Sequence, residues 1–263
     1  MRIVVCVKHV PDVLSERRIE NGRLVRGEDD TLNELDENAV EAAVQAVEDH
    51  GGEVIVLTMG PEDAEDSALL ALQKGADRAI VISDDRLAGS DVIGTAQVLA
   101  AAIRKLADEE IIDAAITGMA SLDGMTSMLP AALATALRWP YIGLAHELEF
   151  TTGRAEILRS ADGFDDRLAT SLPAVISVTD QVNEPRYPNF KAMKAARSKP
   201  LDIWDLDELE NFIDTDSLAI GEHGAGTQVL SAGEHPQRDS AQVVQDSGDG
   251  GIKLAAYIAE VLK

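Results

Sequence analysis

The sequence predicts an α/β protein with a doubly wound, mostly parallel sheet in a three-layer αβα arrangement. Two observations lead to this fold class. Short, nearly continuous apolar runs rich in β-branched residues recur along the first half of the chain, which is typical of strands buried on both faces of a parallel sheet. Stretches with helical periodicity separate these runs, and that alternation implies right-handed crossovers with helices on both faces of the sheet.

The expected strands and helices of the first half follow one another in strict alternation. The strands span residues 2–8, 53–58, 78–83 and 114–117, and the helices span 37–49, 61–74 and 90–107. The single cysteine, Cys6, lies in the first strand. Both a buried small hydrophobe and a reactive thiol are open there, and we favour the first.

The alternation of expected strands and helices ends after Trp139. Residues 145–150 and 155–160 flank a Thr-Thr-Gly turn and predict a hairpin, and a further strand is expected within 167–179. We expect these strands to extend the edge of the sheet.

The last part of the chain is predicted to be an extended arm. Residues 220–250 are rich in Gly, Ser, Asp and Gln with little periodicity, and an amphipathic helix follows at 252–262. The expected organisation is therefore an α/β domain over 1–219 and an arm over 220–263. The helix of the arm must dock on a partner surface or on the body of the chain.

Charge and hydropathy restrict the function. The 263 residues include 47 Asp and Glu against 23 Lys and Arg, so the formal net charge is −24, spread along the chain. A nucleic-acid backbone would be repelled, and the acidity fits solubility in a salty, halophile-like cytoplasm. No apolar stretch is long enough to span a bilayer, and the N-terminus runs directly into a strand pattern, so a cytoplasmic protein is expected.

Motifs for catalysis are not apparent. The first strand leads into Lys-His-Val-Pro-Asp at 8–12, which lacks the glycines of the dinucleotide fingerprint, and there is no phosphate-binding Gly-Lys-Ser/Thr loop. The five histidines lack metal-ligand spacing, and no Ser, His and Asp pattern suggests a nucleophilic triad. We therefore predict no catalytic residue and no metal site.

Three junctions between a strand and a helix carry the most informative polar residues. The segment 117–127 is rich in Gly, Ser and Thr and leads into an expected helix that starts near Leu129. Its backbone N–H groups suit an anion, but Thr126 or Ser127 serves equally well as a plain helix cap with Pro130 in the first turn. The junctions at 33–36 and at Met59 fall on the same edge of the sheet and raise the odds of one shared nucleotide pocket.

These junctions and the second half together resemble the β subunit of the electron transfer flavoprotein family. The run Asn183-Glu184-Pro185-Arg186-Tyr187-Pro188 is the most specific motif. Further matching motifs, in the order and spacing of the family, lie at residues 6–12, 33–39, 75–78, 122–124, 159–163, 172–176 and 235–238. The resemblance covers nearly the whole chain, and it implies a fold of the adenine-nucleotide α-hydrolase-like type and a partner α subunit that holds most of the electron-carrying FAD.

The resemblance also implies which residues contact a nucleotide. In this family the β subunit holds either AMP as a structural ligand or, in the electron-bifurcating branch, a second FAD; residues 6–12 and 187–191 resemble slightly more the bifurcating, nitrogen-fixation-associated type. Met128, Leu129, Phe164 and Asp166 depart from the usual family pattern. The implied contacts are Cys6, Asn33, Glu34, Leu35, Asp36, Met59, Asp123, Gly124, Met125, Thr126, Ser127, Met128, Leu129, Pro130, Ala131, Ala132, Leu133 and Ala134.

A second surface is implied for partner recognition. Residues 187–200 resemble the family's recognition loop, which docks on flavin dehydrogenases, and they place apolar residues in a local basic island on an acidic chain. The alternative is a surface helix whose Phe190 packs inward. The expected recognition residues are Arg186, Tyr187, Phe190, Lys191, Met193 and Lys194.

Two functions from different classes remain after this reasoning. The first is an electron-carrier subunit that, with its α partner, passes electrons from flavin dehydrogenases to a quinone oxidoreductase or a similar acceptor, with the chemistry supplied by flavin. The second is a stand-alone adenine-nucleotide-binding module of the stress-protein type that transfers no electrons. The expected arm and the basic island favour the first.

Overall fold

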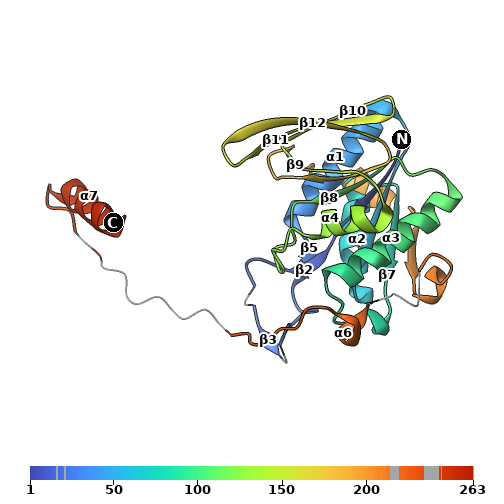
Figure 1. Ribbon diagram of the computed structural model, residues 1–263, viewed down its shortest axis with the longest axis horizontal. Coiled ribbons are helices and arrows are strands. Elements are labelled where there is room, and N and C mark those ends of the chain that lie inside the picture. The colour runs from blue at the N-terminus through green and yellow to red at the C-terminus, as the bar shows by residue number, and fades with distance from the viewer. Residues whose placement is uncertain (16, 21, 214–218, 234–242, 244, 263) are drawn as a thin grey trace. The chain divides into compact units, whose positions relative to one another are not determined.

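The computed structural model describes residues 1–263 apart from 16, 21, 214–218, 234–242, 244 and 263. The motif at 235–238 therefore lies outside the described residues. The chain forms two compact units, Met1–Leu230 and Ser231–Lys263 (Figure 1). The first unit extends past the boundary expected at 219 because backbone N–H groups of the next segment bond to it: Gly221 donates to Ser90 Oγ and Gly226 donates to Asp91 Oδ2, both at 2.8 Å.

The first unit is built on a seven-stranded sheet in which every pair of neighbouring strands is parallel. Its strand order is β14-β7-β6-β1-β8-β13-β9. These strands are β1 Arg2–Cys6, β6 Glu53–Met59, β7 Arg78–Ile82, β8 Ala114–Gly118, β9 Tyr141–Ala145, β13 Ala174–Val178 and β14 Leu201–Trp204. The doubly wound parallel sheet predicted from the sequence is confirmed.

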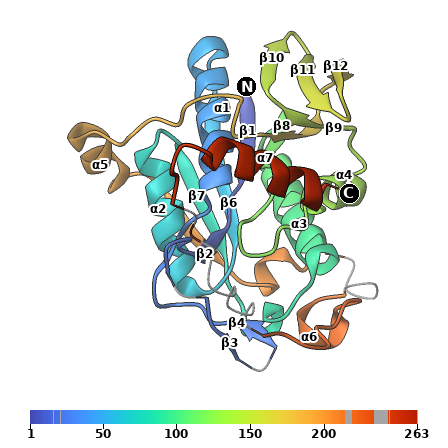
Figure 2. The ribbon, with the colours of Figure 1, turned by 90° about the vertical axis from the view of Figure 1, so that its left-hand side faces the viewer.

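Helices cover both faces of this sheet and create two hydrophobic cores (Figure 2). Alternate residues of β1 divide between them: Ile3 and Val5 face one core, and Val4 and Cys6 face the other. The first core includes residues of α1 Glu34–His50 and α2 Glu65–Gln73, and the second includes residues of α3 Val92–Glu109 and α4 Leu129–Leu137. Burial on both faces explains why these strands lack the alternation of a half-exposed strand.

Two predicted helices differ from the structure at their first turns. The helix expected to start near residue 37 starts at Glu34, and Asn33 occupies its N-cap position. The helix expected at 61–74 is divided into the 3-10 turn η1 Glu62–Ala64 and α2.

The prediction that the hairpin would extend the edge of the main sheet is wrong. β10 Glu147–Thr151, β11 Arg154–Ala161 and β12 Phe164–Ser171 form a separate antiparallel sheet. The strand expected within 167–179 is in fact two: β12, which alternates between exposed and half-buried residues, and β13, which is fully buried and lies between β8 and β9. Phe150, Ala155 and Ile157 attach the separate sheet to the core beneath α1.

Short elements complete the first unit. A long excursion between β1 and α1 carries two small antiparallel pairs, and short helices follow β7, β13 and β14. They are β2 His9–Pro11, β3 Ile19–Glu20, β4 Arg23–Leu24, β5 Asp30–Leu32, η2 Asp85–Leu87, α5 Phe190–Ala196, η3 Asp207–Leu209 and α6 Gly221–Gly224.

The second unit contains α7 Gly250–Val261, which confirms the helix expected at 252–262. Its large apolar side chains, among them Ile252, Leu254 and Tyr257, are exposed. No helix in the described ranges is long and apolar enough to cross a membrane.

Gly118 at the end of β8 determines how closely α1 approaches the sheet. A Cβ atom built on Gly118 would lie 2.5 Å from Asp36 Oδ1 and 2.6 Å from the Leu35 carbonyl oxygen. Real Cβ atoms do not tolerate such distances, and the backbone oxygen cannot rotate away. Only glycine therefore permits this packing.

We predict that Gly118→Ala lowers the free energy of unfolding by about 1–3 kcal/mol, because α1 must shift away from β8. Urea denaturation of the purified chain measures the change. Gly233→Ala is the matched control, since no atom lies within 4 Å of a Cβ built there. Equal midpoints for the two variants would contradict the steric argument.

Candidate functional site

The carboxyl ends of β1 and β8 lie at the place in the strand order where doubly wound folds bind their ligands. β1 lies between β6 and β8, and the chain leaves it towards β6 and β7 before returning to β8 on the other side. This is the topological switch point, where the loops after the two strands separate and leave room for a ligand. The junctions selected from the sequence follow β1, β6 and β8 at this edge.

Asn33 ties the loop after β8 to the start of α1. Its side chain is fully buried; Nδ2 donates to the Ala120 carbonyl oxygen at 2.9 Å, and Oδ1 accepts from the Leu122 N–H at 3.0 Å. The Asn33 backbone N–H donates to the Lys8 carbonyl oxygen at 2.9 Å. Asn33 occupies the N-cap position of α1, but its side chain makes no cap hydrogen bond and instead joins the start of α1 to the loop after β8.

Asp36 is a buried carboxyl group at the same place. Its Oδ2 accepts from the Lys8 backbone N–H at 2.8 Å. Burial raises the pKa of Asp36 to about 7, against the opposing effects of hydrogen bonds from Asn33, Lys8 and Gly118. The Cys6 thiol is 4% exposed, and burial, assisted by Asp36, raises its pKa to about 12. Cys6 is therefore protonated and apolar in character, as the favoured interpretation holds.

The loop after β8 presents backbone donors. Met125 and Ser127 adopt left-handed conformations with φ of 47° and 50°, and the N-cap of α4 is Met128, which makes no side-chain cap bond. Thr126 and Ser127 are therefore not the caps of α4, although Pro130 does lie in its first turn. The N–H groups of residues 126–129 donate to no protein acceptor in the part of the chain that the structure describes. Such donors at a helix N-terminus favour an anion.

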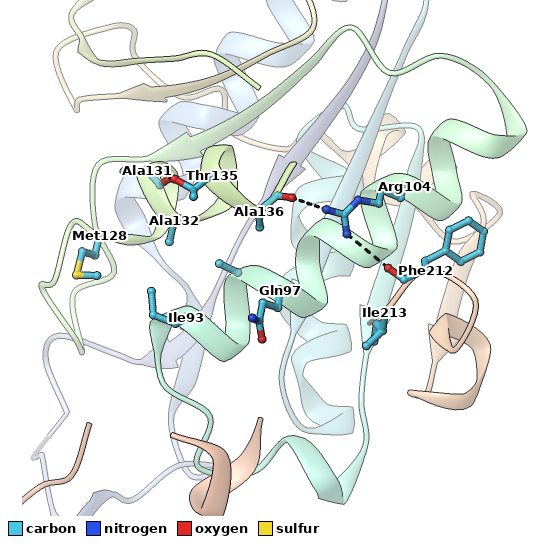
Figure 3. Close-up of a pocket in the computed structure, with 11 residues that line it drawn as sticks. Ile93, Gln97, Arg104, Met128, Ala131, Ala132, Thr135, Ala136, Phe212 and Ile213 are labelled. Atoms are coloured by element: carbon cyan, nitrogen blue, oxygen red, sulfur yellow. Dashed lines mark hydrogen bonds between the residues drawn. The ribbon is translucent and has the colours of Figure 1, made fainter. Parts of the chain in front are cut away.

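The predicted contacts on α4 separate into two groups. Leu133 and Ala134 are buried in the core between α4 and the sheet, whereas Met128, Ala131 and Ala132 are exposed or half-buried and line a groove between α3 and α4 (Figure 3). The groove has a volume of about 510 Å³ and is mostly apolar. Arg104 crosses it and donates to the carbonyl oxygens of Ala136 and Phe212.

The remaining predicted contacts differ in exposure. Glu34 is exposed, Leu35 is half-buried with its carbonyl oxygen against Gly118, and Met59 is half-buried at the end of β6. Gly124 is exposed on the loop after β8. The structure thus joins Asn33, Asp36 and the loop after β8 by hydrogen bonds, while Met59 belongs to the same edge through strand order alone.

Two cations that the sequence analysis did not select converge on Asp123. Lys8 Nζ lies 2.8 Å from Asp123 Oδ2 and 2.9 Å from Oδ1, and Arg26 Nη2 also donates to Oδ2. Burial works against the charged carboxylate, but Lys8 and Arg26 lower the pKa of Asp123 to about 2. Arg26 lies in the excursion between β2 and β5, where no periodicity indicated its position.

Ser67, His9 and Asp30 come together although the sequence showed no triad pattern. His9 Nδ1 lies 2.7 Å from Ser67 Oγ, and His9 Nε2 lies 3.8 Å from Asp30 Oδ2. Ser67 is 1% exposed, so a substrate has no access to its hydroxyl group. The cluster instead ties α2 to the paired strands β2 and β5. Among the described residues, no group of three or more His, Cys, Asp or Glu side chains could hold a metal ion.

Most of the residues expected to recognise a partner are exposed on α5 and on the segment just before it. Phe190 is 83% exposed, Tyr187 is 90% exposed and Met193 is 45% exposed. The α5 residue that packs inward is Ala196. The alternative in which Phe190 packs inward is therefore wrong.

Arg186 fixes the base of this surface. Its guanidinium group binds Glu41 at 2.7 and 3.0 Å and Glu48 at 2.7 and 3.0 Å, both on α1. Hydrogen bonds from both carboxylates raise the pKa of Arg186. Lys199, by contrast, donates to the Leu72 carbonyl oxygen at 3.1 Å, so it anchors the segment after α5 and does not belong to the free basic surface.

The parallel sheet with helices on both faces, and the donor-rich loop beside the β1–β8 crevice, define a doubly wound α/β protein of the class that binds ligands at its switch point. Residues 22–209 match the electron transfer flavoprotein domain. The chain is 36% identical to electron transfer flavoprotein subunit beta of Mycobacterium leprae, and the match covers 97% of each chain. It therefore belongs to the electron transfer flavoprotein β-subunit family.

Two relatives carry other names. The chain is 31% identical to protein FixA of Azotobacter vinelandii over 98% of this chain and 93% of that protein. It is 30% identical to caffeyl-CoA reductase-Etf complex subunit CarD of Acetobacterium woodii over 93% of this chain and 92% of that protein. The family resemblance inferred from the motifs is thus confirmed. Membership of this family favours an electron carrier over a stand-alone nucleotide-binding module.

Asp36 should give the free energy of unfolding a distinctive dependence on pH. Its pKa is about 7 in the folded chain against an ordinary value of 3.8, so the folded state binds the additional proton between these values. The stability that Asp36 contributes is therefore lost as the pH rises from about 4 to about 7. Asp36→Asn removes this loss. The free energy of unfolding of the variant, measured relative to that of the parent, should therefore rise by about 1–3 kcal/mol between pH 5 and pH 8.

Denaturant unfolding at the two pH values measures this gain. All other carboxyl groups are common to both proteins and cancel in the difference. Asp66→Asn, at an exposed position of α2, is the control and should follow the parent. Parallel pH profiles for the parent and Asp36→Asn would show that the carboxyl group titrates normally.

Proposed function

We propose that this chain is the β subunit of a heterodimeric electron transfer flavoprotein that carries electrons from flavin dehydrogenases to a quinone oxidoreductase or a similar acceptor. The observation that carries the proposal is the match to electron transfer flavoprotein β subunits along 97% of the chain. The redox chemistry belongs to the flavin, and the protein binds it, orients it and controls its surroundings. The α subunit would hold most of the FAD.

The crevice between β1 and β8 is the proposed nucleotide site of this subunit. Its ligand would be AMP in a structural role or a second FAD in a bifurcating protein. Buried Asn33 holds the loop after β8 in place. The N–H groups of residues 126–129, which donate to no acceptor in the described structure, would bind an anionic group such as a phosphate. Residues 33–36, 123–134, Cys6 and Met59 are the segments proposed to surround the ligand, with Leu133 and Ala134 supporting the site from the core.

The α5 surface is the proposed docking site for a dehydrogenase. Phe190 and Met193 supply exposed apolar contacts, and Lys191, Lys194 and Arg197 are exposed beside them on a chain with a net charge of −24. An aromatic anchor surrounded by cations suits an acidic partner surface, since the charges steer the encounter and the anchor supplies affinity. Arg186 and Tyr187 would hold the base of this surface.

The exposed apolar side chains of α7 are the proposed contact with the α subunit. Ile252, Leu254, Tyr257, Ile258 and Val261 are each at least 45% exposed in the second unit. An amphipathic helix of this kind gains stability when its apolar stripe is buried on a partner.

The nucleotide content of the heterodimer tests the proposed site. The chain is co-expressed with its α subunit, purified and denatured, and the released nucleotides are separated and quantified by chromatography. We expect one equivalent of FAD with one of AMP if the protein is a simple carrier, and two equivalents of FAD if it is a bifurcating protein. Release of a single FAD and no further adenine nucleotide would reject the site at 123–134.

Phe190→Ala tests the proposed docking surface. Removal of the aromatic anchor should lower kcat/KM for electron transfer from a flavin dehydrogenase by the equivalent of about 1–3 kcal/mol, with nucleotide content unchanged. Phe164→Ala is the matched control, because Phe164 is 70% exposed on the separate antiparallel sheet. Unaltered transfer by Phe190→Ala, or an equal loss in both variants, would count against α5 as the docking site.

A further inference from the structure

The charged cluster of Lys8, Arg26 and Asp123 carries a positive surplus at the proposed nucleotide site. The three side chains come from the end of β1, from the excursion before β5 and from the loop after β8. Two positive charges face one carboxylate, so the pair of cations is only half neutralised.

Exposure shows which charge an incoming ligand meets first. The side chain of Asp123 is 4% exposed, whereas those of Lys8 and Arg26 are 42% and 32% exposed. The carboxylate therefore lies behind the cations. An anion that approaches from solvent reaches Lys8 and Arg26 before Asp123.

Two neighbouring carboxyl groups make their hydrogen bonds elsewhere, although Asp36 interacts with Lys8 through its charge. Asp30 accepts from the Gly27 N–H at 3.0 Å and faces His9, and Asp36 accepts from the Lys8 backbone N–H. Neither of these carboxyl groups pairs with the Lys8 ammonium or the Arg26 guanidinium group in the described structure. The remaining contacts of the two cations are Ser121 Oγ, 3.5 Å from Lys8 Nζ, and the His9 carbonyl oxygen, 3.0 Å from Arg26 Nη1.

We propose that Lys8 and Arg26 bind the 5′-phosphate of the adenine nucleotide and that Asp123 holds both cations in place until the phosphate takes its position. The inference rests on the proposed function, since it assigns the charged partners of the same crevice. Lys8 and Arg26 are not among the contacts that the family resemblance implied. A phosphate is a better partner than a carboxylate for two converging cations because it offers three oxygens and a larger charge.

The free N–H groups of residues 126–129 fit the same assignment. They lie on the loop that carries Asp123, at the positive end of the α4 dipole. Backbone donors from one direction and two cations from another would enclose a phosphate. The adenosine part of the ligand would not contact the cluster.

Because only the phosphate of the ligand would contact the cluster, a comparison of AMP with adenosine tests the proposal specifically. The complete chain is purified with its α subunit, nucleotide is removed under mild denaturant, and binding of AMP and of adenosine is measured by equilibrium dialysis. Lys8→Gln and Arg26→Gln should each weaken AMP binding about tenfold, equivalent to about 1.4 kcal/mol, and leave adenosine binding unchanged. Arg23→Gln is the matched control, because Arg23 lies in the same excursion but binds Glu222 at 2.6 Å.

Asp123→Asn distinguishes a placeholder from a ligand contact. If the phosphate displaces the carboxylate from the cations, removal of its charge should tighten AMP binding about threefold or more and leave adenosine unaffected. Because the AMP-to-adenosine ratio is measured within each protein, a general loss of folding does not imitate the expected pattern.

Several results would overturn the inference. An unchanged AMP-to-adenosine ratio in Lys8→Gln and Arg26→Gln would show that the cluster is only a structural ion-pair network. Weaker binding of both ligands by Asp123→Asn would show that Asp123 contacts the nucleotide itself. Failure of the parent protein to bind either ligand would reject the proposed nucleotide site, whereas AMP binding without the expected selectivity would reject only the role of Lys8 and Arg26.

Discussion

The close contact between the first turn of α1 and the end of β8 controls the geometry of the candidate site. Gly118 allows the Leu35 carbonyl oxygen and the Asp36 carboxyl group to approach β8, and Asn33 then reaches the loop after β8 with both ends of its amide. Because the amide donates to one residue and accepts from another, it fixes the loop in orientation as well as in position. A buried polar group that is fully hydrogen-bonded in this way specifies one arrangement.

This constraint was only partly predictable from the sequence. Strands such as 53–58 and 114–117 were found because apolar β-branched runs indicate burial on both faces, and the edge of the sheet that carries the site followed from strand and helix alternation. Asn33 was selected as a nucleotide contact, but its hydrogen bonds to the loop after β8 were not predicted, because side-chain preference does not reveal a partner 87 residues away. Arg26 was missed for the same reason: its partner Asp123 is distant in the sequence, and no periodicity marks a loop.

The error over the hairpin strands has a different origin. The hairpin was predicted from the stretches 145–150 and 155–160 on either side of a turn, but such a pattern does not specify which sheet the two strands join. Phe150 and Ile157 of the antiparallel strands pack in the same core as residues of α1. The sequence pattern of strands in such a separate sheet is the same as that of strands added to the edge of the main sheet. β13 was identified as part of a longer strand because the change from half-exposed to fully buried residues occurs within one continuous β-prone run.

The distribution of basic residues connects the fold to the proposed function. On this strongly acidic chain several cations hold segments together: Arg186 binds two carboxylates of α1 at the base of the α5 surface, and Lys199 donates to a backbone carbonyl oxygen and anchors the segment after α5. Cations that remain exposed to solvent then gain importance, because the net charge of the chain as a whole is repulsive to anionic partners. Lys191 and Lys194 on α5 and the half-neutralised pair on Asp123 are such places. In the proposed function, these few residues would direct a partner to the α5 surface and a phosphate to the site beside β1 and β8, because the net charge of the chain attracts neither.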